Sequence, residues 1–174
     1  MDSKNKKVIA DLHIPRWNEL PSIDLYLDQV VKLVDSTLSP YIFFNSEDKK
    51  DKNLVLSKTM INNYVKNNLI EAPVKKKYGK KQIAKLFVIC VLKQVYSMSD
   101  IENLIEIGLK NFEISAAYNS FCCQFQKALK CTFEKKDFID SNSALDYNRY
   151  LLKSVLLSCS YKIYTQNVLG KKDK

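Results

Sequence analysis

Polar and basic side chains recur at helical spacing between residues 58 and 66. Those expected to face outward are Lys58, Thr59, Asn62, Asn63 and Lys66. An asparagine amide can bond to the edge of adenine with two hydrogen bonds, and a lysine can meet guanine or a phosphate. The intervening positions are apolar, so the segment predicts an amphipathic helix that begins after an N-cap at Ser57. Its polar face is either a surface that contacts duplex DNA or a solvated helix face.

A second group of basic residues follows Pro73. Its candidate contacts are Lys75, Lys76, Lys77, Tyr78, Lys80 and Lys81. Lysines suit the phosphate backbone, a tyrosine hydroxyl can donate to a phosphate, and a helix N-terminus attracts anions. We therefore expect a short basic hairpin or loop, which we call the wing, in front of a further helix. A run of three lysines also fits a solvated loop, and that reading stays open.

The positive charge of the chain is concentrated around these two groups. The window 49–93 holds twelve lysines and two acidic residues, so its net charge is +10. The rest of the chain has 16 basic and 17 acidic residues, which leaves it at −1 within a total of +9. A basic surface of this kind is typical of nucleic-acid binding.

The elements expected to position these residues are all helical. Glycine and proline are scarce, and apolar residues recur three and four apart. The predicted helices span 23–38 (capped by Ser22), 58–67, 80–95, 99–109 (with a capping box of Ser99 and Glu102), 114–133 and 144–169. The helix at 80–95 is apolar nearly all round, which predicts the central core helix. We expect a loose tail over 1–13, a solvated loop over 46–53 and a frayed end over 171–174.

Two family resemblances follow from these motifs. Residues 57–105 resemble the MerR-type winged helix-turn-helix, with Tyr64, the pair Leu69-Ile70, Tyr78, and Met98 with Ile101 at motif positions. Asn62 stands where that family has arginine, and the wing is shorter. The resemblance implies DNA binding by a winged helix-turn-helix. Together with the helical pattern it leads us to expect an all-α transcriptional regulator, with a winged helix-turn-helix domain over 14–109 and a helical dimerisation or effector region over 110–170.

The first two-thirds of the chain resemble a different family more closely. The segments that carry this resemblance are Leu20–Val30, Met60–Lys66 and Val74–Tyr78. They are similar to the bacterial domain-of-unknown-function family eighteen-thirty-six, which implies no particular biochemistry.

Other kinds of chemistry have little support in the sequence. A single histidine, His13, and five cysteines without metal-binding spacing speak against zinc, and no glycine-rich loop or paired carboxylates point to an enzyme or cofactor. The cysteines lie mostly among apolar neighbours, so we expect reduced thiols in the core. No secretory signal or membrane span is visible, which predicts a cytoplasmic protein.

Three kinds of partner remain possible at this stage. We expect duplex DNA as the main partner and a homodimer through 144–169, where apolar residues cover more than one side of the helix. The alternative is a protein-interaction adaptor that uses the same scaffold and helix. A membrane-surface binder is a weaker alternative, because the lysines flank a buried helix and do not line an exposed apolar stripe.

Overall fold

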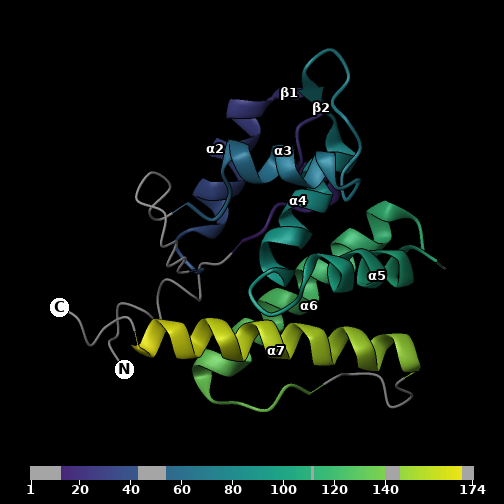
Figure 1. Ribbon diagram of the computed structural model, residues 1–174. Helices are drawn as coiled ribbons and strands as arrows, with labels where there is room; N and C mark the ends of the chain where they lie inside the picture. The colour runs from purple at the N-terminus through teal and green to yellow at the C-terminus, as the bar shows by residue number, and fades with distance from the viewer. Residues whose placement is uncertain (1–12, 43–53, 111, 140–145, 170–174) are drawn as a thin grey trace.

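The computed structural model describes residues 13–42, 54–110, 112–139 and 146–169 of the 174-residue chain (Figure 1). The elements are η1 (Trp17–Glu19), β1 (Leu25–Tyr26), α2 (Leu27–Leu38), α3 (Lys58–Lys66), β2 (Lys77–Tyr78), α4 (Lys80–Leu92), α5 (Met98–Leu109), α6 (Ile114–Glu134) and α7 (Tyr147–Leu169). This confirms a mainly α-helical protein. In the part of the chain that is described, no helix has the length and apolar character needed to cross a membrane. The tail predicted over 1–13, except His13, the loop over 46–53 and the end over 171–174 lie outside the described residues.

α4 forms the centre of the core, as its sequence predicts. Nine of its residues are buried, including Ile83, Phe87 and Cys90, and they point to every side of the helix. α2 packs on it from one direction, and α6 and α7 pack on it from another. A helix buried on all sides fixes the positions of its neighbours, because each must fit the same close-packed surface.

α2 begins four residues later than the predicted start at Ile23, so that prediction and the Ser22 cap are wrong. Leu25 and Tyr26 form β1 instead, and they pair antiparallel with Tyr78 and Lys77 of β2. Ile23 is left 71% exposed. The backbone N–H of Tyr26 then donates to Oε1 of Gln29 at 2.9 Å, which caps the helix at its new start.

The start of α5 is also displaced from its prediction. Ser97, not Ser99, is the N-cap, and its hydroxyl oxygen accepts from the N–H of Asp100 at 3.2 Å. The Asp100 carboxylate accepts in return from the N–H of Ser97 at 3.3 Å. The predicted box of Ser99 and Glu102 is therefore wrong. Ser97 with Asp100 and Ser99 with Glu102 both have the spacing of a capping box. In the structure the first pair forms the box, and Ile101 is buried.

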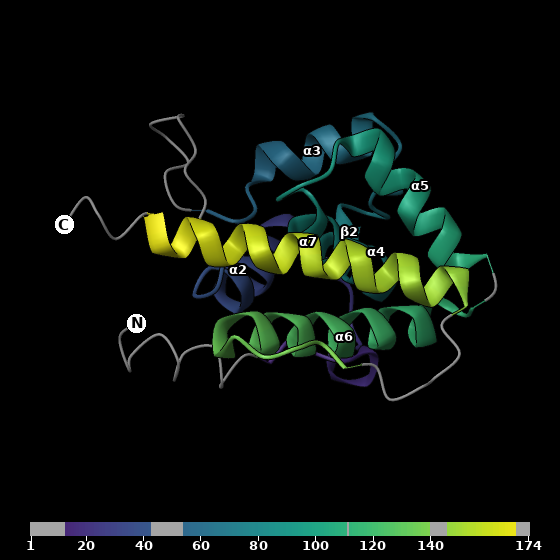
Figure 2. The same ribbon diagram turned by 90° about the horizontal axis from the view of Figure 1, so that it is seen from below.

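α6 and α7 lie side by side and run in the same direction (Figure 2). The rings of Phe133 and Tyr164, near the ends of the two helices, meet edge to face with centroids 5.2 Å apart. The described residues that follow α6, up to Ile139, run back along this helix (Figure 2). Phe138 lies on this return, beneath the ammonium groups of Lys127 and Lys153 at 5.1 and 5.4 Å.

The five cysteines are free thiols, and three of them are buried as predicted. Burial raises the pKa of Cys90 and of Cys122 to about 11, and that of Cys159 to about 12. These three thiols are therefore protonated at neutral pH and are poor nucleophiles. Cys123 is exposed and Cys131 is half-buried, so these two do not belong to the fully buried core.

The side chain of Gln82, in the first turn of α4, joins three parts of the preceding segment. Its Oε1 accepts from the N–H of Gly79 at 2.6 Å, and its Nε2 donates to the carbonyls of Glu71 and Ala72 at 2.8 and 3.2 Å. Only 9% of Gln82 is exposed. We call these three bonds the Gln82 clamp, and they hold both ends of the wing segment against α4.

Breaking this clamp should destabilise the fold. We expect Gln82→Leu to lower the free energy of unfolding by about 2–4 kcal/mol, because three partly buried hydrogen bonds are lost at once. Urea denaturation measures the change. Gln94→Leu is the matched control. Among the described residues the side chain of Gln94 bonds only to the carbonyl of Cys90, so this variant should cost about 1 kcal/mol or less. Equal losses in the two variants would contradict the role of the clamp.

Candidate nucleic-acid interface

The start of α3 is anchored to α2. Ser57 caps the helix by accepting from the N–H of Met60 at 3.2 Å, as the sequence predicts. Just before it, the N–H of Val55 donates to a carboxylate oxygen of Asp35 on α2 at 2.7 Å. The ammonium of Lys93 reaches the carbonyl of Val55 at 2.5 Å. These bonds determine where α3 begins.

The two faces of α3 are those that its sequence predicts. Ile61 and Tyr64 are buried, and Met60 and Val65 are half-buried against the core. The five predicted contact residues are all exposed: Lys58, Thr59, Asn62, Asn63 and Lys66. α3 therefore presents a continuous polar face, two of whose members carry positive charge.

Asn68 ends α3 in the left-handed conformation, with φ of 57°. The N–H groups of Leu69 and Ile70 then donate back to the carbonyl of Tyr64 at 2.9 and 3.3 Å. Both side chains enter the core, where they are 7% and 1% exposed. The helix predicted over 58–67 ends close to this point, and asparagine tolerates the positive φ that the end requires.

The wing is a tight reverse turn with two lysines at its tip. Val74 and Lys77 exchange backbone hydrogen bonds of 3.0 and 2.9 Å, so only Lys75 and Lys76 lie between them. These two residues have φ of 50° and 65°. A two-residue hairpin turn with positive φ at both positions favours asparagine and glycine. A lysine held in this conformation costs roughly 1–2 kcal/mol.

Aromatic rings support two further lysines beside the turn. The ammonium of Lys77 lies 4.9 Å from the ring centre of Tyr26, and that of Lys80 lies 5.6 Å from the ring centre of Trp17. Tyr26 comes from β1, which completes the small sheet next to the turn. Cation–π contact holds these charges in place without neutralising them.

Other lysines of the basic window have acidic or structural partners. Lys58 pairs with Asp28 on α2 at 2.5 Å, and Lys85 pairs with Glu71 at 2.6 Å. Burial favours a raised pKa for Glu71, but the hydrogen bond and charge of Lys85 outweigh it and hold that pKa below its ordinary value. Among the described residues, Lys66, Lys75 and Lys76 form no ion pair. Lys49, Lys50 and Lys52 lie outside the described residues.

Tyr78 is not a surface contact, which corrects the prediction made for it. Its side chain is only 3% exposed, and burial raises its pKa. Its backbone pairs with Leu25, and its ring belongs to the core. The described contact candidates are therefore the α3 face, Lys75, Lys76 and Lys77 at the turn, and Lys80 and Lys81 at the start of α4.

Residues 15–121 match the family described as Domain of unknown function (DUF1836). The chain belongs to this family. The match confirms the predicted resemblance to family eighteen-thirty-six. It ends within α6, so it includes the whole α3–wing surface. No curated protein matches the chain, and no solved structure does.

Sequence reasoning missed several residues that build this surface of the DUF1836 protein. Trp17 and Tyr26 support lysines that lie some fifty residues or more away in the chain, and no local pattern signals such pairs. Gln82 was detectable in principle, because it stands three residues after Gly79, at the position where glutamine completes a capping box. Its bonds to the carbonyls of Glu71 and Ala72 carry no such signal.

Relieving the strain at the turn should stabilise the protein. We expect Lys75→Asn combined with Lys76→Gly to raise the free energy of unfolding by about 1 kcal/mol, because these residues adopt a positive φ more easily. Urea denaturation measures the difference. The pair Lys75→Arg and Lys76→Arg keeps both the charge and the strain, so its stability should equal that of the wild type. A loss of stability in the Asn-Gly variant would show that the turn is not strained.

Proposed function

We propose that this DUF1836 protein is a transcriptional regulator that binds duplex DNA in the cytoplasm through a winged helix-turn-helix of the MerR type. The observation that supports this most directly is that α3 and the lysine turn both lie at one end of the molecule, away from α6 and α7 (Figure 1). Both surfaces are exposed, and both come from the window that carries the excess positive charge.

In this proposal α3 enters the major groove. Its nine residues make a helix about 13 Å long, which is comparable with a groove about 12 Å wide. Asn62 and Asn63 offer amides for base edges, and Thr59 offers a hydroxyl. Lys66 meets phosphate or guanine. Because Asn62 stands where the MerR type has arginine, the bases read at this position should differ from those that an arginine selects.

The turn supplies backbone contacts as the wing. Lys75 and Lys76 stand at its tip in a conformation that destabilises the fold, although asparagine and glycine would fit there without strain. Strain of this kind is concentrated at functional sites. Phosphates flank any helix that lies in the major groove of DNA. Two cations at the tip of the turn would contact them, which gives a physical reason for keeping lysines in this strained conformation.

Lys58 can join the interface by exchanging its partner. Its ion pair with Asp28 is exposed, with 60% and 71% of the two side chains accessible. An exposed pair of this type contributes about 0–1 kcal/mol, so a DNA phosphate can replace the carboxylate at little cost. Lys80 and Lys81 lie at the N-terminus of α4, whose dipole also favours an anion.

DNA affinity and stability should change in opposite directions when the turn is altered. The variant Lys75→Asn with Lys76→Gly should bind duplex DNA more weakly and should lower the slope of log K against log salt by about 2, because two phosphate contacts are lost. Fluorescence anisotropy with labelled duplexes at several salt concentrations measures both effects. Duplexes of random sequence are used as the labelled probe at first. Selection of bound duplexes from a random pool then supplies a preferred sequence.

Two control variants separate charge at the turn from charge elsewhere. Lys75→Arg with Lys76→Arg should retain affinity. Lys130→Asn with Lys162→Asn removes two exposed charges from α6 and α7, and it should change the slope by much less than the turn variant does. If both charge-removing variants lost affinity equally, binding would depend on total charge and the wing assignment would be wrong.

We further propose that two copies associate through α7. Seven positions, spaced alternately three and four apart, share one side of this helix: Tyr147, Tyr150, Ser154, Leu157, Tyr161, Tyr164 and Val168. Leu157 and Tyr164 are half-buried against the core, whereas Tyr147, Tyr150 and Tyr161 are 77%, 60% and 57% exposed. We call this stripe the α7 seam. Its spacing is that of a coiled coil, and two identical seams can pair about a two-fold axis.

Charges placed on the seam should separate the copies. The wild type should sediment at twice the 20.2 kDa mass of the chain. Tyr150→Glu combined with Tyr161→Glu should sediment as a monomer, because the charges would be buried without partners. Lys162→Glu, on the same helix but off the seam, should remain dimeric. A wild type that stays monomeric at the highest attainable concentration would refute the seam as a dimer contact.

The second candidate function is a protein-interaction adaptor. The exposed tyrosines of the α7 seam favour it, since aromatic residues are enriched at protein interfaces. A chain that fails to bind duplex DNA at low salt, but forms a complex lost on Tyr150→Glu with Tyr161→Glu, would support the adaptor over the regulator.

A further inference from the structure

α5 is packed much less tightly than the other core-facing helices. Ile101 is its only buried residue, although its sequence is rich in leucine and isoleucine. Leu104, Ile105 and Leu109 are half-buried, and Ile107 is 38% exposed. Leu104 and Ile105 touch the edge of the core without being buried in it, and this partial packing leaves space between α5 and the rest of the protein.

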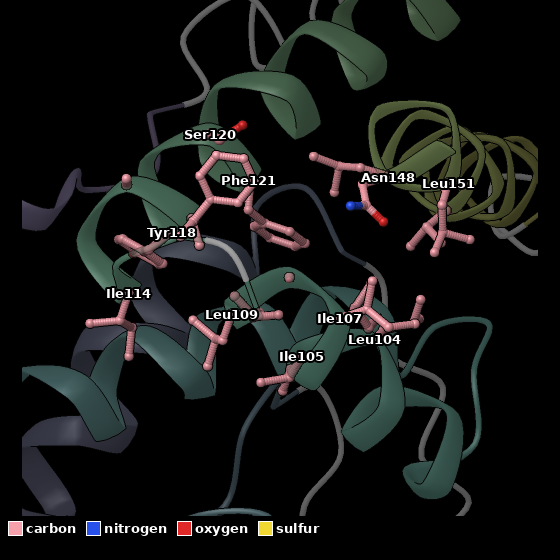
Figure 3. Close-up of a pocket in the computed structure, with 18 of the residues that line it drawn as sticks. Leu104, Ile105, Ile107, Leu109, Ile114, Tyr118, Ser120, Phe121, Asn148 and Leu151 are labelled. Carbon is pink, nitrogen blue, oxygen red and sulfur yellow. The ribbon is translucent and has the colours of Figure 1, made fainter. Parts of the chain in front are cut away.

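That space is a cavity of about 450 Å³ between α4, α5, α6 and the first turns of α7. Figure 3 shows Leu104 and Ile107 of α5 facing Phe121 of α6 and Leu151 of α7 across it. Val88 of α4 also lines it. Its volume lies within the range of about 300–1,000 Å³ that is typical of small-molecule sites. Walls on four helices suit a compact ligand better than an added helix.

Polar groups gather where the cavity meets the start of α7. Asp146, Asn148 and Arg149 line this part. A carboxylate oxygen of Asp146 accepts from the backbone N–H of Arg149 at 2.8 Å, so Asp146 serves as the cap of the helix. Nε of Arg149 lies 3.9 Å from the other oxygen, beyond hydrogen-bonding distance. Among the described residues, no group accepts a hydrogen bond from the Arg149 guanidinium, so its donors can serve another anion.

A second cation on the cavity wall, Lys85, already has an acidic partner. The ammonium of Lys85 is bound to Glu71 at 2.6 Å, and only 19% of the Lys85 side chain is exposed. Arg149, by contrast, is 52% exposed. A ligand with an apolar body and one negative group would place the body among the leucine, isoleucine and phenylalanine side chains. Its charge would lie against Arg149, with the Asn148 amide beside it.

We propose that this cavity binds a small apolar carboxylic acid, with the carboxylate paired to Arg149. Such a ligand matches both features of the site: its apolar part covers exposed hydrophobic surface, and its anion accepts from guanidinium donors that no described residue occupies. The proposal does not depend on DNA binding, since α3 and the wing contribute nothing to the cavity.

Calorimetric titration of the full-length protein tests the proposal, with decanoate as the probe and decanol as its uncharged counterpart. Decanoate should bind one molecule per chain. Val88→Phe, which fills the cavity from α4, should abolish that binding. Val31→Phe is the matched control, because Val31 is a half-buried valine on α2 that does not line the cavity, and it should bind normally. Circular dichroism checks that both variants are folded.

The charge on the ligand is tested separately. Arg149→Gln should weaken decanoate binding about tenfold and leave decanol binding unchanged. Lys162→Gln, on the exposed side of α7, should change neither. The proposal is overturned if decanoate does not bind with one-to-one stoichiometry, or if Val88→Phe leaves its binding intact. It is also overturned if Arg149→Gln affects the acid and the alcohol equally.

Discussion

The proposed DNA-binding end of the protein depends on the three hydrogen bonds of Gln82. The residues before the wing, Glu71 and Ala72, and the residue after it, Gly79, bond to this one buried amide. Because Gln82 belongs to α4, the clamp connects an exposed turn directly to the helix at the centre of the core. Without the clamp, the turn would be held, among the described residues, only by the small sheet and by the contact of Lys77 with Tyr26.

This connection explains how the turn can hold two lysines in an unfavourable conformation. A four-residue turn cannot supply the free energy that Lys75 and Lys76 lose, so the surrounding contacts must supply it. The pairing of β1 with β2, the ring of Tyr26 beneath Lys77 and the clamp provide these contacts. α3 is anchored separately, through Asp35 and Ser57. Two independent anchors give a rigid surface, which a protein that reads DNA requires.

The tightness of packing differs across the molecule, and each proposed function uses a different part of the surface. α4 is buried on all sides, whereas α5 leaves a cavity and α7 leaves an apolar seam in contact with solvent. Close packing around α4 stabilises the fold, so uncovered apolar surface elsewhere is available for other molecules. The wing surface, the cavity and the α7 seam use different side chains. A ligand or a second copy can therefore bind without displacing DNA contacts directly.

The sequence by itself determined the helical class, the central place of α4, and the two faces and approximate extent of α3. These features follow from patterns within a single turn or helix, where the interacting residues are close in the chain. Only the tertiary structure decided that residues 25–26 form a strand and that Tyr78 is buried. Only it placed rings under Lys77 and Lys80 and left a cavity beside α5. Each of these depends on residues far apart in sequence, and local spacing carries no information about such pairs.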